Sequence, residues 1–310
     1  MKHVFIINPS AGKKDSRQKV YDMADALRER HGVEVECMLT TSRGHATQLA
    51  RSIAALGEPV RFYACGGDGT VNEVANGIVG FDNAAMTAIP IGTGNDFLKN
   101  FGQEKLPLFS DAENLWDGEV KKIDLIECNG RQCLCIACSG LDARIADDVH
   151  KFGTNNKLDG KSAYVLSLAA NFLLKDIGRH WTVTLGDTVL EDDFALVAVC
   201  NGRFYGGGFM PVAEASLTDG VLDTLVVKNV SKANFLRFVG PYSKGEYRKF
   251  PKYAQSYTVP EIRIHSDGEE ITTCVDGETI RAHDIVIRLS GHKLNFFGPT
   301  GFDPDATRRV

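Results

Sequence analysis

Residues 65–73 read CGGDGTVNE, and they join a β-like run at 61–64 to a helix-like run at 71–79. A second turn of the same kind, PIGTGNDF at 90–97, follows the next strand-like run. Glycine lets main-chain N–H groups approach a ligand without an intervening Cβ, and the start of a helix offers unpaired donors to an anion. The two turns therefore predict a phosphate-binding site.

The spacing of these glycines excludes the two commonest nucleotide motifs. Neither turn reads G-x-x-x-x-G-K-[ST], and neither has the G-x-G-x-x-G dinucleotide spacing. Gly and Asp also dominate ordinary tight turns, so a single turn would leave a purely structural explanation open. Two such turns in consecutive strand–helix units favour ligand binding.

The first part of the chain alternates between strand-like and helix-like segments. The expected strands are 3–7, 33–39, 61–64 and 86–91, and the expected helices are 20–27, 46–56 and 71–79. Such alternation predicts an α/β domain with a doubly wound parallel sheet, in which ligands bind at the carboxyl ends of the strands. Residues 8–12 and Thr40 also follow predicted strands, so four motifs are expected to converge there.

Beyond residue 118 the pattern changes to short strand-like runs, with helix-like segments at 162–174 and 232–239. The runs are 121–128, 132–138, 181–185, 194–199, 222–227, 262–265, 271–275 and 285–289. Regularly spaced short strands favour an antiparallel sandwich or barrel. We therefore expect a nucleotide-binding domain at 1–123 and an all-β sandwich domain at 124–292.

Composition narrows the class of protein. A chain of 310 residues is long enough for two domains, and a formal net charge of -5 argues against a nucleic-acid partner. No N-terminal signal pattern is present, and the apolar segment 164–174 is too short to span a bilayer. We expect a cytoplasmic location. Strand-like alternation among the four Cys of 128–138, with no His nearby, favours buried packing over a zinc site.

Two stretches carry a family resemblance. GGDGTVNEVANGI at 66–78 and IPIGTGNDF at 89–97 resemble the diacylglycerol kinase catalytic domain of bacterial lipid kinases. GGDGT alone is shared more distantly with NAD kinases and phosphofructokinases, and GTGNDF favours the lipid branch. The resemblance covers nearly the whole chain. It implies that residues 293–310 return to the first domain, that a homodimer is possible, and that the enzyme meets its lipid substrate at the membrane surface.

The resemblance also assigns the cofactors, ATP and Mg²⁺. A kinase needs Mg²⁺ to neutralise the phosphates and a base near the acceptor hydroxyl. Asp68, Asp96 and Asp124 are implied to share a water-mediated Mg²⁺ at the interdomain cleft. ATP is expected to contact Asn8, Pro9, Ser10, Ala11, Gly12, Thr40, Gly66, Gly67, Asp68, Gly69, Thr70, Val71, Asn72 and Thr93.

Asp276-Gly277-Glu278 is a candidate catalytic motif. Taken alone it predicts a hairpin turn, and residues 267–269 repeat the same tripeptide. The resemblance favours 276–278, because the family's acidic motif follows an apolar strand and precedes a final strand pair. It implies that Glu278 is the general base and that Asp276 is its partner or lies near the metal. A base of this kind works best with a pKa raised toward neutrality.

Two further elements of the second domain match the family. Residues 201–211, NGRFYGGGFMP, resemble its glycine-rich element, with a flexible loop as the alternative. The loop 216–221 resembles a structural Mg²⁺ site made by the main-chain carbonyls of Ser216 and Val221 and the carboxylate of Asp219. Basic and aromatic residues interleave at 242–253, either as a membrane-contacting segment or as a solvated loop.

The favoured function is a lipid kinase that phosphorylates a lipid hydroxyl, with diacylglycerol first among the acceptors. Two alternatives stay open. One is a soluble NAD kinase-like enzyme, which the GNDF turn and the triple glycine disfavour. The other is a catalytically silent lipid- or nucleotide-binding regulator. The sequence does not identify the acceptor lipid.

Overall fold

The computed structural model describes residues 1–12, 15–92, 94–145, 147 and 176–309 as two compact units. The first unit comprises Met1–Leu125, Ser216–Asp219 and Ser290–Arg308, and the second comprises Ile126–Ala215, Gly220–Leu289 and Arg309–Val310. The helix-like segment expected at 162–174 and the predicted ATP contact Thr93 lie outside the described residues.

The first unit is an α/β domain built on a six-stranded sheet of order β2-β1-β3-β4-β17-β5. Its strands are β1 (Lys2–Ile7), β2 (Glu34–Leu39), β3 (Val60–Gly66), β4 (Ala84–Pro90), β5 (Glu119–Ile123) and β17 (Leu294–Gly298). Its helices are α1 (Arg17–His31), α2 (His45–Ala54), α3 (Asp68–Ile78) and α4 (Asp96–Lys99), with 3₁₀ turns η1 (Leu106–Ser110) and η2 (Ala112–Asn114). All neighbouring strands pair in parallel except β5, which is antiparallel to β17.

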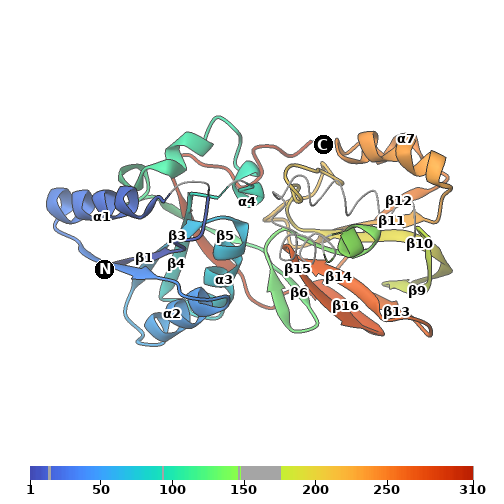
Figure 1. The fold of residues 1–310 in the computed structure, drawn as a ribbon, viewed down its shortest axis with the longest axis horizontal. Helices are drawn as coiled ribbons and strands as arrows, with labels where there is room; N and C mark the ends of the chain where they lie inside the picture. The colour runs from blue at the N-terminus through green and yellow to red at the C-terminus, as the bar shows by residue number, and fades with distance from the viewer. Residues whose placement is uncertain (13–14, 93, 146, 148–175, 310) are drawn as a thin grey trace. The chain divides into compact units, whose positions relative to one another are not determined.

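Helices cover both faces of this sheet, as the alternation of segments predicts. Figure 1 shows α1 and the 3₁₀ turns on one face and α2 with α3 on the other. The central strands are apolar along their length because neither face meets water. Val4, Phe5 and Ile6 of β1 are fully buried, and α1 packs Val20 and Leu27 inward.

The strand register places the expected ligand-binding turns together. Ile7 at the end of β1 lies opposite Cys65 of β3, and Gly66 lies opposite Pro90 of β4. The strand order reverses direction between β1 and β3, and this is the topological switch point at which open α/β sheets bind ligands. The segments that follow β1, β3 and β4 therefore border the same crevice.

The second unit is an antiparallel β domain with an eleven-stranded sheet, so the predicted fold class is confirmed for both parts of the chain. Nine strands follow the order β15-β14-β8-β10-β9-β13-β16-β6-β7, and β11 pairs with β10 and β12. The strands are β6 (Ile126–Cys128), β7 (Arg131–Cys133), β8 (Ile136–Gly140), β9 (Arg179–Leu185), β10 (Thr188–Cys200), β11 (Leu222–Lys228), β12 (Ala254–Val259), β13 (Glu261–His265), β14 (Ile271–Val275), β15 (Glu278–Ala282) and β16 (Asp284–Leu289). Among its described residues, 141–145 are also helical, and helix α7 (Lys232–Tyr242) and the 3₁₀ turn η3 (Tyr247–Lys249) follow later in the chain.

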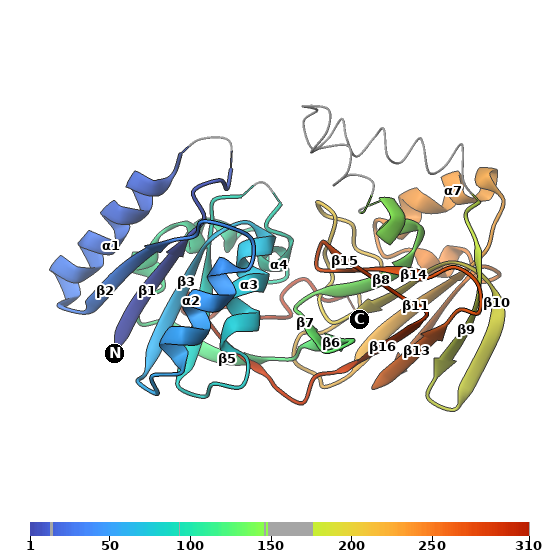
Figure 2. The ribbon, with the colours of Figure 1, turned by 60° about the horizontal axis from the view of Figure 1, so that its bottom comes forward.

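One apolar core holds this unit together. Side chains from nine of its strands meet there, among them Trp181, Val197, Ile264 and Ile287. Strands far apart in the sheet order contribute to the same core, so the sheet folds over onto itself, and Figure 2 shows its two layers. The burial of alternate residues along β9 is typical of a strand with one face in such a core.

Two cysteines of the segment 128–138, Cys128 and Cys133, belong to this core. Cys128, Cys133, Cys135 and Cys138 are buried and none forms a disulfide. Burial raises the pKa of the Cys128 thiol to about 12, because desolvation disfavours the thiolate. These thiols therefore pack as small apolar groups.

Among the described residues, no helix combines the length and the apolar character that a membrane span requires.

Candidate active site

Two glycine-rich turns lie against each other at the carboxyl ends of β3 and β4. A Cβ built on Gly92 would lie 2.5 Å from the Cα of Gly67, so the two backbones touch where any side chain would separate them. The carbonyl of Gly66 accepts hydrogen bonds from the N–H groups of Ile91 and Gly92, at 3.0 and 3.1 Å. The turns thus form a single main-chain surface.

Asp68 links the same two turns through its side chain. It is the first residue of α3, and its Oδ1 accepts the N–H of Phe97 at 3.1 Å, at the start of α4. A Cβ on Gly94 would lie 2.7 Å from Asp68 Oδ2. Because α3 begins at this turn, the positive end of its dipole lies there too, which favours a bound anion.

The segment after β1 completes the surface. The N–H of Asn8 donates to the carbonyl of Cys65 at 2.9 Å, and its Nδ2 donates to Thr70 Oγ1 at 3.2 Å. Gly12 has a φ of +81°, and a Cβ there would lie 2.5 Å from the carbonyl oxygen of Ile91. The structure therefore brings residues 8–12 beside both turns.

Glu73 is a residue at this site that sequence reasoning missed. Its carboxylate accepts the N–H of Gly44 at 2.8 Å and the N–H of Ala46 at 3.2 Å, both at the start of α2. Thr47 Oγ1 donates to the main-chain carbonyl of Glu73 at 2.8 Å. Glu73 thus ties α3 to the loop that follows Thr40. The only sequence signal is its place in α3, directly after the GGDGT turn.

The three carboxylates expected to share Mg²⁺ each have a nitrogen partner in the structure. Asp68 accepts from Phe97, while Asp96, buried at 8% exposure, lies 2.5 Å from Lys99 Nζ. Asp124, at 2% exposure, lies 2.6 Å from Lys293 Nζ. In the described part of the chain, no group of three or more His, Cys, Asp or Glu side chains is arranged to hold a metal ion. A Mg²⁺ here would depend on one or two carboxylates together with water and phosphate oxygens.

The predicted structural Mg²⁺ loop is held by the C-terminal segment. Asp305 accepts Ser216 Oγ at 2.6 Å and the N–H of Leu217 at 2.9 Å. The carboxylate of Asp219 lies 3.0 Å from the guanidinium of Arg308. Ser216 and Asp219 belong to the first unit and Val221 to the second. Asp219 therefore has a cationic side chain as its partner in this structure.

Asp276 fixes the turn that precedes the candidate base. It has a φ of +44°, and its carboxylate accepts the N–H groups of Leu134, Cys135 and Ile136 at 2.5, 3.1 and 3.2 Å. Three main-chain donors therefore fix the position of this carboxylate. The structure gives Asp276 the role of anchoring the turn to the start of β8.

Glu278 is the first residue of β15 and forms an ion pair with Arg131, the first residue of β7. Its side chain is 19% exposed, whereas that of Glu269 in the repeated tripeptide is 79% exposed. Arg131 is a second residue that sequence reasoning missed. Glu269 also pairs with an arginine, Arg179, at 3.3 Å, so burial and not the ion pair distinguishes Glu278 from the acid of the repeated tripeptide.

The glycine-rich element at 201–211 is ordered by main-chain contacts. Gly206, Gly207 and Gly208 all have positive φ, between +58° and +119°, which side chains rarely adopt. The N–H of Tyr205 donates to the carbonyl of Phe209 at 3.0 Å, and the N–H of Phe209 donates back at 2.9 Å. Residues 205–209 therefore form a turn that is closed by two main-chain hydrogen bonds.

A partly buried acid, Asp142, lies beside this turn, and no sequence pattern indicates it. Asp142 Oδ2 accepts hydrogen bonds from the hydroxyls of Tyr205 and Tyr242, the latter at 3.0 Å. Desolvation raises the pKa of Asp142, and the two hydroxyls act in the opposite direction. The cluster holds the glycine-rich turn to α7.

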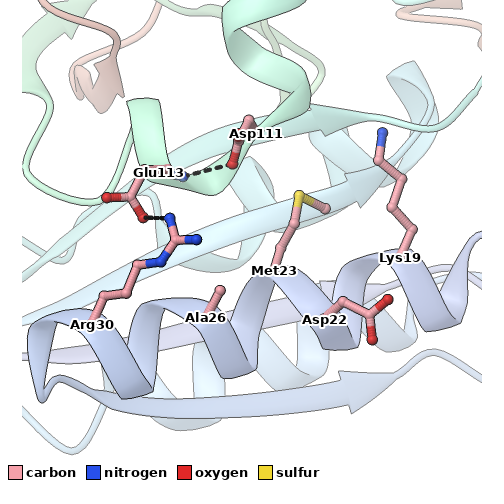
Figure 3. Close-up of a pocket in the computed structure, with 7 residues that line it drawn as sticks. All are labelled: Lys19, Asp22, Met23, Ala26, Arg30, Asp111 and Glu113. Carbon is pink, nitrogen blue, oxygen red and sulfur yellow. Dashed lines mark hydrogen bonds and ion pairs between the residues drawn. The ribbon is translucent and has the colours of Figure 1, made fainter.

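A separate surface cavity of about 370 Å³ lies between α1 and η2 (Figure 3). Its lining is mixed in charge: Lys19, Asp22, Met23, Ala26, Arg30, Asp111 and Glu113. Figure 3 shows Arg30 reaching Glu113 across it, with nitrogen and oxygen 3.4 Å apart. None of the predicted site residues lines this cavity, so we do not assign the active site to it.

Both units match known protein families. Residues 2–128 match the diacylglycerol kinase catalytic domain, and residues 135–297 match the YegS C-terminal NAD kinase beta sandwich-like domain. A diacylglycerol kinase of Bacillus subtilis is 30% identical over 256 residues, which are 78% of each chain. The chain belongs to the diacylglycerol kinase-related family of bacterial lipid kinases.

Two further relatives extend the match. A Pseudomonas aeruginosa protein named "Probable lipid kinase YegS-like" is 30% identical over 291 residues, covering 94% of this chain and 93% of its own. A solved structure described as "Crystal structure of a putative diacylglycerol kinase from Bacillus anthracis str. Sterne" superimposes with a TM-score of 0.75 at 24% identity, and the match covers 96% of this chain and 97% of the other. The last comparison shows a common fold. The predicted family is confirmed.

Proposed function

We propose that this lipid kinase transfers the γ-phosphoryl group of ATP, with Mg²⁺, to the hydroxyl of a lipid, and that diacylglycerol is the favoured acceptor. The observation that supports this best is the contact between the two glycine turns at the switch point of the first unit. A main-chain surface next to a helix N-terminus suits a polyphosphate. The Bacillus subtilis relative, which is named a diacylglycerol kinase, supports the acceptor class.

ATP suits the first unit because the turns present main-chain peptide groups, without intervening side chains, to the phosphates. The Cβ positions of Gly12 and Gly92 are occupied by neighbouring backbone, so the surface is made of peptide groups. We assign phosphate binding to residues 66–72 and 8–12. Thr40 lies at the end of β2, and its N–H donates to the Ile7 carbonyl at 2.9 Å. We assign it a contact with the nucleotide at the same strand ends.

Mg²⁺ suits the carboxylates that flank these turns. Asp68 and Asp96 offer oxygen ligands, which Mg²⁺ prefers, and Mg²⁺ normally completes its shell with water and phosphate oxygens. When bound, the ion would neutralise charge that develops on the transferred phosphoryl group. Lys99 Nζ lies 2.5 Å from the Asp96 carboxylate and would orient it.

Glu278 is the proposed general base of the second unit. The acceptor hydroxyl oxygen forms a bond to the γ-phosphorus, its proton passes to the Glu278 carboxylate, and ADP leaves with the electrons of the broken bond. Arg131 orients the carboxylate, and the hydrogen bonds of Asp276 fix the turn before it. The remaining catalytic effect is positioning and electrostatics.

Transfer of labelled γ-phosphate from Mg·ATP in mixed micelles tests the proposal. Diacylglycerol, sphingosine, ceramide, phosphatidylglycerol and undecaprenol would be offered separately, with NAD in a parallel reaction. We expect label in diacylglycerol. Label in another lipid would keep the kinase and change its acceptor, and label in NAD would replace the proposal by the NAD kinase alternative. Intact ATP binding with no labelled product would favour a silent regulator.

Glu278→Gln tests the base. The amide keeps the size of the side chain but cannot take the proton, so we expect kcat to fall by at least about 100-fold, the lower end of what general bases contribute. The ATP Kd, measured by calorimetry, is expected to stay unchanged because Glu278 lies in the second unit.

Glu269→Gln is the matched control for this variant. It changes the same position of the repeated tripeptide, where the side chain is exposed. We expect wild-type turnover from it. Wild-type turnover from Glu278→Gln would remove Glu278 from the proposed mechanism.

A further inference from the structure

Helix α7 presents two distinct faces. Phe235, Phe238 and Tyr242 are buried, at 2–4% exposure, against the rest of the second unit. Lys232, Leu236 and Arg237 lie on the opposite, exposed face, where Leu236 is 65% exposed. At 100° per residue, Leu236 falls between Lys232 and Arg237 around the helix. An exposed leucine is thus bracketed by two cations.

Basic side chains continue beyond the end of α7. Residues 232–252 contain six Lys or Arg and a single acidic residue, Glu246, although the whole chain has a net charge of -5. Lys244, Arg248, Lys249 and Lys252 are all exposed. We use the name α7 surface for Lys232, Leu236, Arg237, Lys244, Arg248, Lys249 and Lys252. Arg248 forms an ion pair with Glu214, and the surface keeps a net positive charge, opposite in sign to that of the chain as a whole.

The surroundings of Glu246 show that the cations gather in space as well as in sequence. Lys249 Nζ lies 2.7 Å from the Glu246 carboxylate, and its hydrogen bond is the main cause of a lowered Glu246 pKa. Lys244 and Arg309 lower that pKa further by their charge. The guanidinium of Arg309, from the end of the chain, donates to the Lys244 carbonyl at 3.4 Å. One acid therefore faces three cations.

Aromatic packing joins α7 to the turn that follows it. The ring of Phe238 packs edge-on against Phe250, with centroids 5.4 Å apart, and is tilted against Tyr242 at the same distance. Tyr247 is buried at 3% exposure, and Arg248 lies over its ring at 5.0 Å. The helix and the turn after it are joined by these contacts. Figure 1 shows α7 on the outside of the sheet.

We propose that the α7 surface docks onto a bilayer containing anionic phospholipid, with Leu236 entering the boundary between headgroups and acyl chains. Cations near an anionic leaflet each contribute about 1 kcal/mol, which is about fivefold in binding. The apolar side chain of Leu236, which lies among the cations, can be buried at the boundary of the acyl chains. A polyanion such as RNA would leave this side chain exposed to water. The combination favours a membrane over a nucleic acid.

This inference rests on the proposed function for its purpose, because a lipid kinase must reach a substrate held in a bilayer. Its test measures binding without ATP, so the docking and the kinase activity can fail separately. Phosphorylation of lipid in detergent micelles without binding to vesicles would overturn only the docking proposal. One that binds vesicles without phosphorylating any lipid would overturn only the proposed function.

Co-sedimentation of the full chain with vesicles tests the proposal. We expect binding to phosphatidylcholine mixed with phosphatidylglycerol and at least about tenfold weaker binding to phosphatidylcholine alone. Arg237→Gln and Leu236→Ser are each expected to weaken binding to the anionic vesicles about fivefold, through one lost charge and one lost apolar contact. Circular dichroism would check that both variants stay folded.

Two substitutions elsewhere in the same unit serve as controls. Val189 is 62% exposed and Arg263 has a side chain 63% exposed, and both lie outside the α7 surface. Val189→Ser and Arg263→Gln are expected to bind vesicles as the wild type does. Equal loss in the controls and in the α7 variants would overturn the assignment of docking to this surface.

A tryptophan probe separates insertion from simple charge attraction. We expect the emission of Leu236→Trp to shift to shorter wavelength when anionic vesicles are added, and that of Val189→Trp to stay unchanged. A shift in neither variant, with binding intact, would overturn the insertion of Leu236. Equally strong binding of a single-stranded oligonucleotide, lost in both Arg237→Gln and Leu236→Ser, would replace the membrane by a nucleic acid.

Discussion

The nucleotide side and the acceptor side of the proposed reaction are built in different ways. In the first unit, main chain contacts main chain, as where Gly92 lies against Gly67. These contacts join turns that directly follow neighbouring strands. In the second unit, side chains meet partners far away in the sequence, such as Asp276 with Leu134, 142 residues apart. A surface made of main chain depends on the sequence positions of glycine. A surface made of side chains depends on how strands that are far apart in the sequence pair with each other.

The repeated tripeptide makes the same point within one unit. Asp276 and Asp267 each begin the sequence Asp-Gly-Glu, but Asp276 accepts three main-chain N–H groups whereas the Asp267 side chain is fully exposed beside His265. Local sequence is identical, and the surroundings decide which copy is anchored. Three changes probe this contrast between the two kinds of surface.

Gly92→Ala should have the largest effect, because it breaks the main-chain surface directly. Its Cβ would lie 2.5 Å from the Cα of Gly67, and backbone has to move to relieve that overlap. Overpacking of this kind costs about 1–3 kcal/mol, so we expect the ATP Kd to rise by up to roughly 100-fold. Isothermal titration calorimetry with ATP measures it.

Gly291→Ala is the control for this variant, because its Cβ would meet no atom within 4 Å. We expect it to bind ATP as the wild type does. An unchanged ATP Kd in folded Gly92→Ala would mean that the turns do not form the nucleotide surface. The claim that main chain builds the nucleotide side would then be wrong.

Asp276→Asn tests the side-chain surface and should have an intermediate effect. The amide offers one acceptor oxygen and no charge to the N–H groups of Leu134, Cys135 and Ile136. We expect the free energy of unfolding to fall by about 2 kcal/mol, since bonds to charged groups contribute about 1.5–3 kcal/mol each. The kcat should fall with it while the KM for ATP stays constant. Urea unfolding and initial rates measure the two effects.

Asp267→Asn supplies the comparison for the second tripeptide. Its side chain is fully exposed, so we expect stability and turnover to match the wild type. Equal loss of stability in the two variants would show that the anchoring of 276–278 has no special role.

The sequence predicts the first unit better than the second for a physical reason. Glycine at 92 records a close backbone approach at the residue itself, and the alternation of strands and helices records burial on both faces of a sheet. Both signals are local, so a pattern along the chain reveals them. Strand β17, from near the end of the chain, lies between β4 and β5 in the first sheet, and no local sequence pattern indicates this position. Only the family resemblance implied that the end of the chain belongs to the first domain.

Arg131, Asp142 and Glu73 could not be found in this way. Arg131 meets Glu278 because β7 and β15 belong to one folded sheet, and Asp142 meets Tyr205 and Tyr242 through a turn and a helix far along the chain. A charged side chain follows no period of 2 or 3.6, so its partner is defined only by the tertiary structure. The resemblance supplied Glu278 but not the arginine that orients it.

Glu73→Gln should have the smallest effect, and it tests whether a side chain also supports the main-chain surface of the first unit. Glutamine keeps one acceptor oxygen for the N–H groups of Gly44 and Ala46 and loses the charge that favours the start of α2. We expect the loop after Thr40 to loosen and the KM for ATP to rise about fivefold, equivalent to about 1 kcal/mol, with kcat unchanged.

Initial rates across a range of ATP concentrations separate this positioning role from a general loss of stability, which would lower kcat instead. Glu29→Gln, on the exposed side of α1, is expected to leave both constants unchanged. If Glu73→Gln has a wild-type KM while Glu73→Ala raises it, a single neutral acceptor is sufficient for the loop. If both variants keep the wild-type KM, the nucleotide side depends on main chain alone, and the contrast between the two units is sharper than the structure indicates.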